Sequence, residues 1–298
     1  MSWDPVLVRT LAAVVDAGTL EQAARRLHVT PSAVSQRVKL LEQQSGHRLL
    51  VRSKPVRATT AGRAVLRHAQ RLAVIEHDLR VELGVDPEGP TTLPVAVNAD
   101  SLATWFLPRI AALTADEDVV LDLRTADEEQ TAPLLEDGVV TAAVTARRDA
   151  VSGCRVRAIG AMEYVAVAAP SWLERWATAS TQEAVHVGPR VDFDRHDALQ
   201  RRWLAERYVG RPVEGPVHRV PSSGGFVRAV ELGLGWGLLP QVQAAALVAD
   251  GRVQRLGDDT LLVELWWQHP TDSSGLLDRL TAAVLADDGA LAPVTSRR

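Results

Sequence analysis

The chain has 298 residues, of which 46% are hydrophobic and 23% charged, as is ordinary for a soluble globular protein. Its formal net charge of −4 is unevenly spread, because residues 1–80 hold 13 basic against 6 acidic side chains and residues 81–298 hold 20 against 31. We expect neither a signal peptide nor a membrane span, and the single cysteine, Cys154, argues against a disulfide or a cysteine-rich zinc site. We therefore expect a cytoplasmic protein whose basic N-terminal region binds nucleic acid.

Two capped helices are predicted within residues 19–46. Thr19 and Gln22 form a capping box, and Thr30 is an N-cap followed by Pro31 at the first helical position. The outer face of the second helix carries small polar, amide and basic side chains: Ser32, Ser35, Gln36 and Lys39. Such a face suits entry into the major groove of DNA. Two capped amphipathic helices also occur in many α-rich domains, so the spacing alone leaves DNA binding open.

The flanking segments favour a winged helix-turn-helix. A first helix is predicted at about 5–17, ending at Gly18, and a short strand at 49–51 with cations around it. A hairpin beside the second helix would bring those cations to phosphate. A long helix is predicted from Thr60 to about Leu83. Its apolar residues recur at seven-residue intervals, which favours pairing with another helix, although packing on its own domain is the alternative.

Beyond a hinge rich in glycine and proline at 84–92, strands and helices alternate up to a last helix at about 274–286. This order is typical of a parallel sheet with helices on both faces. The predicted strands are 93–97, 119–124, 141–145, 155–159, 164–168, 213–220, 235–239, 252–256 and 262–267. The predicted helices between them are 101–113, with an interruption near Pro108, and 131–136, 171–176, 197–207 and 225–232.

Residues 23–42, 46–49 and 59–62 together carry a specific motif. The run A-A-x-x-L-x-V-T-P-S-A-V-S-x-x-V-x-x-L-E, then G-x-x-L and T-T-A-G, resembles the N-terminal domain of LysR-type transcriptional regulators. Chain length and element order fit that family over all 298 residues. The resemblance implies an all-α winged helix-turn-helix with a linker helix, followed by an α/β effector-binding region of two Rossmann-like lobes, similar to a periplasmic binding protein.

The resemblance also implies domain boundaries and partners. The DNA-binding domain is expected at 1–60, the linker and dimerisation helix at 61–84, lobe I at 93–162 and 268–298, and lobe II at 163–267. The expected partners are a double-stranded DNA operator, a small-molecule effector, further copies of this chain in a homodimer or a dimer of dimers (a homotetramer), and RNA polymerase. The candidate DNA contacts are Thr30, Pro31, Ser32, Ser35, Gln36, Arg37, Lys39, Arg52 and Lys54.

Effector sites in such lobes lie at strand ends and helix N-termini. The candidate effector contacts at these places are Asn98, Asp100, Ser101, Asp127, Glu128, Thr145, Asp194, His196, Ser222 and Ser223. Asp100 is either the N-cap of a helix or the partner of a ligand ammonium. The acids at 127–129 are either a solvated face or part of the site.

Within the family, residues 97–108, 142–145, 153–156, 193–197 and 233–240 resemble the ArgP/LysG-type regulators of basic amino acid export. This implies lysine, arginine or histidine as the effector, with the ligand cations on acidic side chains and its carboxylate on hydroxyls and helix N-termini. Asp194 departs from the subgroup, which usually has an amide there.

Two other classes of function stay open from the residues alone. A different small carboxylate or amine could be the effector, and a DNA-binding architectural protein needs no effector. An enzyme is disfavoured because no nucleophile–base pair and no metal-ligand spacing stands out, so no cofactor is expected.

Overall fold

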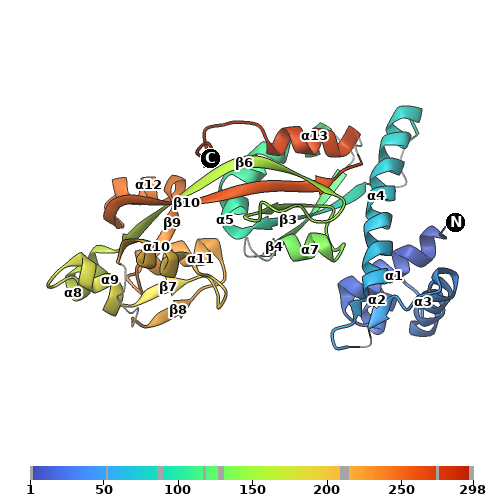
Figure 1. The fold of residues 1–298 in the computed structure, drawn as a ribbon, viewed down its shortest axis with the longest axis horizontal. Helices are drawn as coiled ribbons and strands as arrows, with labels where there is room; N and C mark the ends of the chain where they lie inside the picture. The colour runs from blue at the N-terminus through green and yellow to red at the C-terminus, as the bar shows by residue number, and fades with distance from the viewer. Residues whose placement is uncertain are drawn as a thin grey trace.

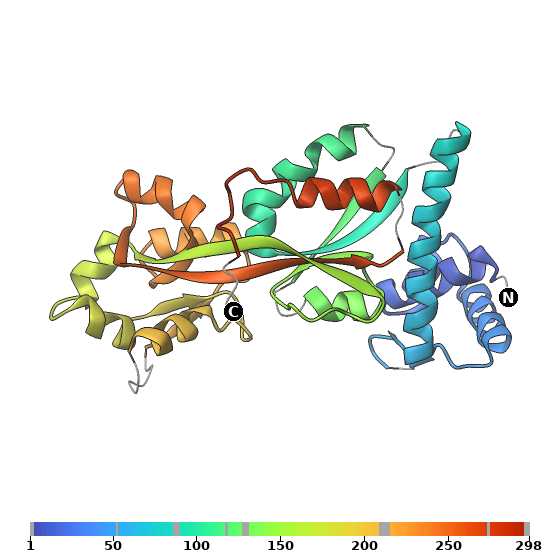
Figure 2. The same cartoon turned by 45° about the horizontal axis from the view of Figure 1, so that its top comes forward.

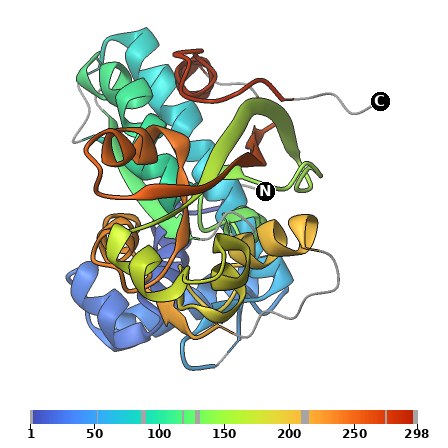
Figure 3. The ribbon, with the colours of Figure 1, turned by 90° about the vertical axis from the view of Figure 1, so that its left-hand side faces the viewer.

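The computed structural model describes residues 3–51, 53–85, 90–116, 119–126, 131–208, 215–272 and 275–294. The molecule is elongated: a helical head (residues 3–58) lies at one end, the long helix α4 (Thr60–Leu83) stands beside it, and two lobes follow in a row (Figure 1). Figure 3 views the molecule from the far lobe, with the head behind. None of the helices in the described ranges is long and apolar enough to cross a membrane.

The head contains three helices and a small hairpin: α1 (Pro5–Ala17), α2 (Leu20–Arg26), α3 (Pro31–Ser45), β1 (Leu50–Val51) and β2 (Arg57–Ala58). The two strands pair antiparallel, with Leu50 opposite Ala58, and form the wing that the basic segment predicted.

The predicted helix signals of the head are confirmed. The Thr19 and Thr30 side chains accept hydrogen bonds from the N–H groups of Gln22 and Ala33, at 3.2 Å each. The inner face of α3 is buried at Val34, Val38 and Leu41, as the spacing predicts. Caps and apolar stripe together fix the orientation of α3 and leave its other face to solvent.

Helix α4 is capped by Thr59 at its start and ends at Gly84, which adopts φ 62°. The packing of this helix on its own chain is confirmed on one side, and pairing with another helix stays a prediction for the other side. Val74 and His77 are buried, while Leu72, Ile75, Leu79 and Leu83 are exposed. The exposed stripe follows helical spacing, as a helix-pairing surface does.

The lobes share a six-stranded sheet with the order β4-β3-β5-β10-β6-β9. Its strands are β3 (Thr91–Asn98), β4 (Val119–Ala126), β5 (Ala142–Thr145), β6 (Cys154–Ala168), β9 (Gly237–Pro240) and β10 (Gln254–Pro270). Only β3, β4 and β5 are mutually parallel, and β10, β6 and β9 run antiparallel to their neighbours. The fully parallel sheet expected from strand–helix alternation is therefore corrected to a mixed sheet.

The two long strands connect the lobes. Sequence reading split each into two, at 155–159 with 164–168 and at 252–256 with 262–267, whereas β6 and β10 are continuous and run side by side through both lobes (Figure 2). The strand register is irregular near Gly257 and between Leu265 and Trp266. These irregularities interrupt the alternation of inward and outward side chains without ending the strands. The lobe boundaries stay a prediction. The chain is predicted to enter lobe II at residue 163 and to return to lobe I at residue 268. Because Glu163 pairs with Leu262, the structure favours a return to lobe I nearer Leu262 than Gln268.

Lobe I consists of β3, β4, β5, the adjoining ends of β6 and β10, and five helical segments. These are α5 (Ala99–Ser101), a π-helical turn (Leu102–Phe106), α6 (Leu107–Asp116), α7 (Thr131–Glu136) and α13 (Gly275–Val284). The π-helical turn lies just before Pro108, where the sequence predicts an interruption, because proline cannot donate the regular helical hydrogen bond.

Lobe II holds the other ends of β6 and β10, β9, and a two-stranded parallel sheet of β7 (Arg190–Asp192) and β8 (Val217–Arg219). Its helices are α8 (Pro170–Trp176), α9 (Thr181–Val187), α10 (Leu199–Arg207), α11 (Ser223–Glu231) and α12 (Gln241–Ala249). Sequence reading missed β7, α9 and α12, which are only three, seven and nine residues long. The largest core cluster joins both lobes and buries five tryptophans completely: Trp105, Trp172, Trp203, Trp236 and Trp267.

Candidate functional site

The first candidate surface is the outer face of α3 together with the wing. Six predicted DNA contacts are exposed there: Thr30, Pro31, Ser32, Gln36, Lys39 and Lys54. Ser35 and Arg37 are partly exposed, and Arg52 lies outside the described residues. Lys39 and Lys54 make no ion pair with any acid in the part of the chain that the structure describes, so both charges are available to a phosphate.

The turn before α3 sets how the helix is presented. His28 adopts φ 53°, a left-handed conformation that is uncommon outside glycine and that sequence reasoning did not single out. The Thr30 hydroxyl oxygen accepts from Ala33 N–H at 3.2 Å and lies 2.9 Å from the Ser32 hydroxyl oxygen. Thr30 therefore orders the start of α3, and the exposed side chains beyond it extend into solvent.

Polar side chains of α4 dock on lobe I. Arg67 donates to the carbonyl of Glu136 at 2.5 Å, Gln70 to that of Gly138 at 2.6 Å, and Arg71 to that of Gly153 at 3.0 Å. Gly138 adopts φ 68°, and a Cβ there would lie 2.9 Å from Arg67 Cγ. The contact therefore requires glycine at this position, and it fixes α4 against the end of α7.

A second contact joins the head to lobe I. Arg124 on β4 donates to Asp16 of α1 at 2.7 Å and to Asp122 at 2.6 Å, and Arg26 of α2 also pairs with Asp16. Burial of Asp16 opposes its ionisation, but the hydrogen bonds from Arg26 and Arg124 outweigh it and hold the pKa of that carboxyl below its ordinary value. The Asp16 carboxylate thus links two head helices to the sheet of lobe I.

The second candidate site lies where β3 ends. Asn98 is the last residue of β3 and the N-cap of α5, and the parallel register of β3 with β5 brings the end of β5, Thr145, alongside it. In open α/β sheets ligands bind outside the carboxyl ends of the strands. The position is therefore the expected one for a ligand of this architecture.

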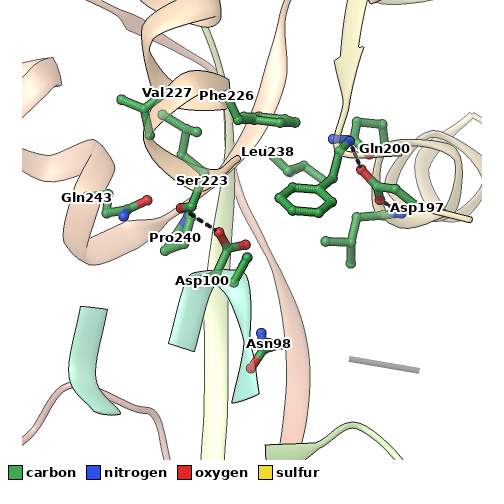
Figure 4. Close-up of a pocket in the computed structure, with 14 residues that line it drawn as sticks. Asn98, Asp100, Asp197, Gln200, Ser223, Phe226, Val227, Leu238, Pro240 and Gln243 are labelled. Atoms are coloured by element: carbon green, nitrogen blue, oxygen red, sulfur yellow. Dashed lines mark hydrogen bonds between the residues drawn. The ribbon is translucent and has the colours of Figure 1, made fainter. Parts of the chain in front are cut away.

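A pocket at this place is formed by both lobes (Figure 4). Lobe I contributes Asn98, Ala99 and Asp100 from the start of α5. Lobe II contributes the remaining lining residues: Phe193, Asp197, Leu199, Gln200, Ser223, Phe226, Val227, Leu238, Leu239, Pro240 and Gln243. The accessible volume is about 40 Å³. This is room for a few water molecules, so an amino acid would have to widen the pocket.

Asp100 bridges the two lobes. Its Oδ1 accepts from the Ser223 hydroxyl on α11 and its Oδ2 from the Tyr164 hydroxyl on β6, both at 2.9 Å. The N-cap of α5 is Asn98, so the interpretation of Asp100 as a mere N-cap is wrong. A carboxylate that accepts from neutral hydroxyls can exchange those donors for other N–H or O–H groups.

Three more oxygens of the pocket lining are acceptors without a donor. Asn98 Oδ1, Gln200 Oε1 and Gln243 Oε1 are buried and have no hydrogen-bond partner among the described residues. No lysine, arginine or histidine lines the pocket within the ranges that the structure describes. The lining therefore combines acidic and amide oxygens with the rings of Phe193 and Phe226, an environment that favours a ligand rich in N–H donors.

The structure brings together only part of the predicted effector set. Asn98, Asp100 and Ser223 line the pocket, and Ser222 is the N-cap of α11, accepting from Gly225 N–H at 3.3 Å. Ser101 and Thr145 are fully buried and do not line the pocket. Ser101 follows Asp100 in the sequence, and Thr145 ends β5, the strand beside β3. Asp127 and Glu128 lie outside the described residues.

Asp194 and His196 do not line the pocket. Asp194 Oδ1 accepts from the N–H groups of His196 and Asp197, at 2.6 and 3.1 Å, so it shapes the turn before α10. The His196 side chain is 70% exposed. Sequence reasoning left Gln200 and Gln243 out of its candidate set, because single amides in helices carry no motif signal.

Comparison with known proteins gives consistent matches. Residues 6–63 match the model of the bacterial regulatory helix-turn-helix proteins of the lysR family, and residues 88–286 match the LysR substrate binding domain. The chain is 44% identical to the HTH-type transcriptional regulator LysG of Mycobacterium tuberculosis over 278 residues, covering 93% of this chain and 90% of that protein.

Two further matches cover almost the whole chain. The lysine export transcriptional regulatory protein LysG of Corynebacterium efficiens is 40% identical over 282 residues, covering 95% of this chain and 97% of that protein. The full-length structure of LysG from Corynebacterium glutamicum with bound effector Arg has a TM-score of 0.74 at 36% identity, covering 98% of this chain and 100% of that one. These matches run through both the head and the lobes.

Proposed function

This chain belongs to the LysR family of helix-turn-helix transcriptional regulators, and from this premise we propose that a basic amino acid is its effector and an amino acid exporter gene its target. The observation that carries the proposal is the pocket lining, which presents carboxylate and amide oxygens and, among the described residues, no cation. The names of its relatives support the same reading, since one is a lysine export regulator and another binds arginine.

The ligand ammonium would take the place of the donors that Asp100 now has. Tyr164 and Ser223 donate neutral hydroxyls at 2.9 Å, and a charged N–H donor makes a stronger hydrogen bond to a carboxylate. This exchange frees the Ser223 hydroxyl. The Ser223 hydroxyl can then donate a hydrogen bond to the ligand carboxylate, together with the N–H groups at the start of α11.

The exchange also provides a switch, because the Asp100–Ser223 hydrogen bond joins lobe I to lobe II. Ligand binding replaces a direct link between the lobes by a link through the ligand, so the two states differ in lobe position. A ligand shifts such an equilibrium only by its differential affinity for the two states. The contacts of Arg67, Gln70, Arg71 and Arg124 tie lobe I to α4 and the head, and would carry the movement to the DNA-binding face.

The remaining assignments follow the same model. Two copies would pair through the exposed stripe of α4, and two pairs would form a tetramer. The nine predicted DNA contacts would hold each head on a half-site, with Ser32, Ser35 and Gln36 nearest base edges. The protein would act in the cytoplasm as a regulator without catalytic activity, and RNA polymerase would be a further partner.

Calorimetric titration of the full chain tests the proposal. We expect saturable binding of L-arginine, L-lysine or L-histidine and no binding of L-leucine or benzoate, because the pocket offers acceptors to the ligand side chain. Saturable binding of benzoate with none of a basic amino acid would overturn the effector assignment and leave the family membership standing.

A further inference from the structure

One amide in the pocket has a fixed orientation. Gln200, at the start of α10, is 1% exposed, and its Nε2 donates to the carbonyl of Val191 at 2.9 Å. Because a carbonyl oxygen only accepts, the nitrogen must face Val191 and the oxygen must face the other way. Gln200 Oε1 is then a buried acceptor without a partner among the described residues. Such a group costs free energy unless a donor reaches it.

A second amide with a buried oxygen lies on another helix. Gln243 of α12 lines the pocket, and its Oε1 is buried without a partner in the described part of the chain. In Figure 4, Gln200 and Gln243 are drawn on opposite sides of the Asp100–Ser223 hydrogen bond. The two amides therefore line the same pocket as the carboxylate that the proposed function assigns to the ligand ammonium.

We propose that Gln200 and Gln243 determine specificity by accepting hydrogen bonds from the N–H groups at the end of the effector side chain, and that they favour a guanidinium. This inference rests on the proposed function and deepens it. The two amide oxygens lie on different helices, so each needs its own N–H donor from the ligand. A guanidinium presents five N–H groups in a rigid plane, whereas an ammonium presents three on one atom.

The apolar lining agrees with a flat cation. Phe193 and Phe226 belong to the same pocket, and aromatic faces attract a guanidinium through cation–π and stacking contacts. Leu238 adds an apolar surface for the methylene stem. The expected order of affinity is therefore arginine above lysine, with both above citrulline, which keeps the shape of arginine but replaces its cationic end by a neutral group with an acceptor oxygen.

The test measures the affinities of the full chain for L-arginine, L-lysine and L-citrulline by calorimetry in the wild type, Gln200→Met and Gln243→Met. Methionine keeps the length of glutamine and removes the acceptor. Gln241→Met is the matched control, because Gln241 is on α12, also has a buried oxygen without a partner among the described residues, and does not line the pocket. Circular dichroism checks that each variant is folded.

The ratio of the citrulline to the arginine dissociation constant should fall about tenfold in each of the two pocket variants, since one hydrogen bond to a charged group is lost. It should not change in Gln241→Met. Gln243→Met keeps the inference testable if the loss of the Val191 contact unfolds Gln200→Met.

Three results would overturn the inference alone: arginine binding with an unchanged ratio in the folded pocket variants, lysine binding more tightly than arginine, or an equal fall in the control. A wild type that binds neither arginine nor lysine would overturn the proposed function as well.

Discussion

The DNA-binding face and the effector pocket are both polar, but they are built from opposite groups. On the face of α3 and the wing, Lys39 and Lys54 are exposed cations that pair with no acid in the described ranges. In the pocket, Asp100 and three amide oxygens are acceptors, and no cation of the described residues joins them. Each surface is opposite in charge to its proposed ligand. The basic face would bind DNA, a polyanion, and the pocket with its acceptor oxygens would bind a cationic amino acid.

The difference in burial matters as much as the difference in charge. Exposed cations contact phosphates in water, so each contributes little and is weakened by salt. Buried acceptors interact in a medium of lower polarity, so a single group has a large effect. The two surfaces should therefore respond to mutation on different scales.

The largest effect is expected at Asp100. Asp100→Asn removes the carboxylate but keeps the shape. Asp100 is partly buried in the free chain, and a ligand between the lobes would bury its charged hydrogen bond. Truncating one partner of such a bond costs about 2–5 kcal/mol, that is about 30-fold or more in affinity. Calorimetry with arginine measures the loss. Asp194→Asn is the matched control outside the pocket. An equal loss in both variants would contradict the assignment of Asp100.

A smaller effect is expected at Lys39. Lys39→Ala should weaken DNA binding at specific and random sequences alike and lower the slope of log affinity against log salt by about one, because one phosphate contact is lost. Fluorescence anisotropy over a range of salt concentrations measures this slope. Arg148→Ala, which removes a cation from lobe I, should leave it unchanged. A loss confined to one specific sequence would instead place Lys39 on a base edge.

The smallest effect is expected at Asp16, in the contact between the head and lobe I. Its lowered pKa means that the ionised form stabilises the fold above the ordinary value of 3.8, and that this stability disappears as the pH falls through the lower folded-state pKa. Asp16→Asn should lower the unfolding free energy at pH 7 by at most about 1 kcal/mol, because the pair is partly exposed.

The pH dependence and a double mutant check the Asp16 contact. The difference in unfolding midpoint between wild type and Asp16→Asn should shrink only below about pH 4. Because the two side chains share one interaction, the effects of Asp16→Asn and Arg124→Gln should be less than additive. A difference that persists unchanged in acid, or strict additivity, would show that Arg124 does not act through Asp16.

The head could be predicted from the sequence because its signals are local. A threonine cap and its N–H partner lie three residues apart, as at Thr19 and Thr30, and the buried positions Val34, Val38 and Leu41 follow the helical period. Each of these patterns is complete within one helix and its cap. The mixed sheet was missed because the pairing of β6 with β10 joins residues about a hundred positions apart, which no local pattern reports.

The pocket could be predicted only in part, for the same reason. Asn98 and Asp100 sit where a strand ends and a helix begins, which a sequence pattern can locate. Gln200 and Gln243 reach the pocket only through tertiary packing. Asp194 resembled a ligand-binding acid from its neighbours in sequence, but its carboxylate is turned to the backbone of His196 and Asp197. Short polar side chains before helices often serve the backbone in this way.

The most direct test of the central claim is an experimental structure of the full chain with L-arginine. We expect the ligand between the lobes, with a ligand nitrogen in hydrogen-bond distance of Asp100 and the Asp100–Ser223 hydrogen bond broken. Arginine bound elsewhere, or bound in the pocket while Asp100 keeps both hydroxyl donors, would contradict the claim that this pocket recognises a basic amino acid through its acceptor oxygens.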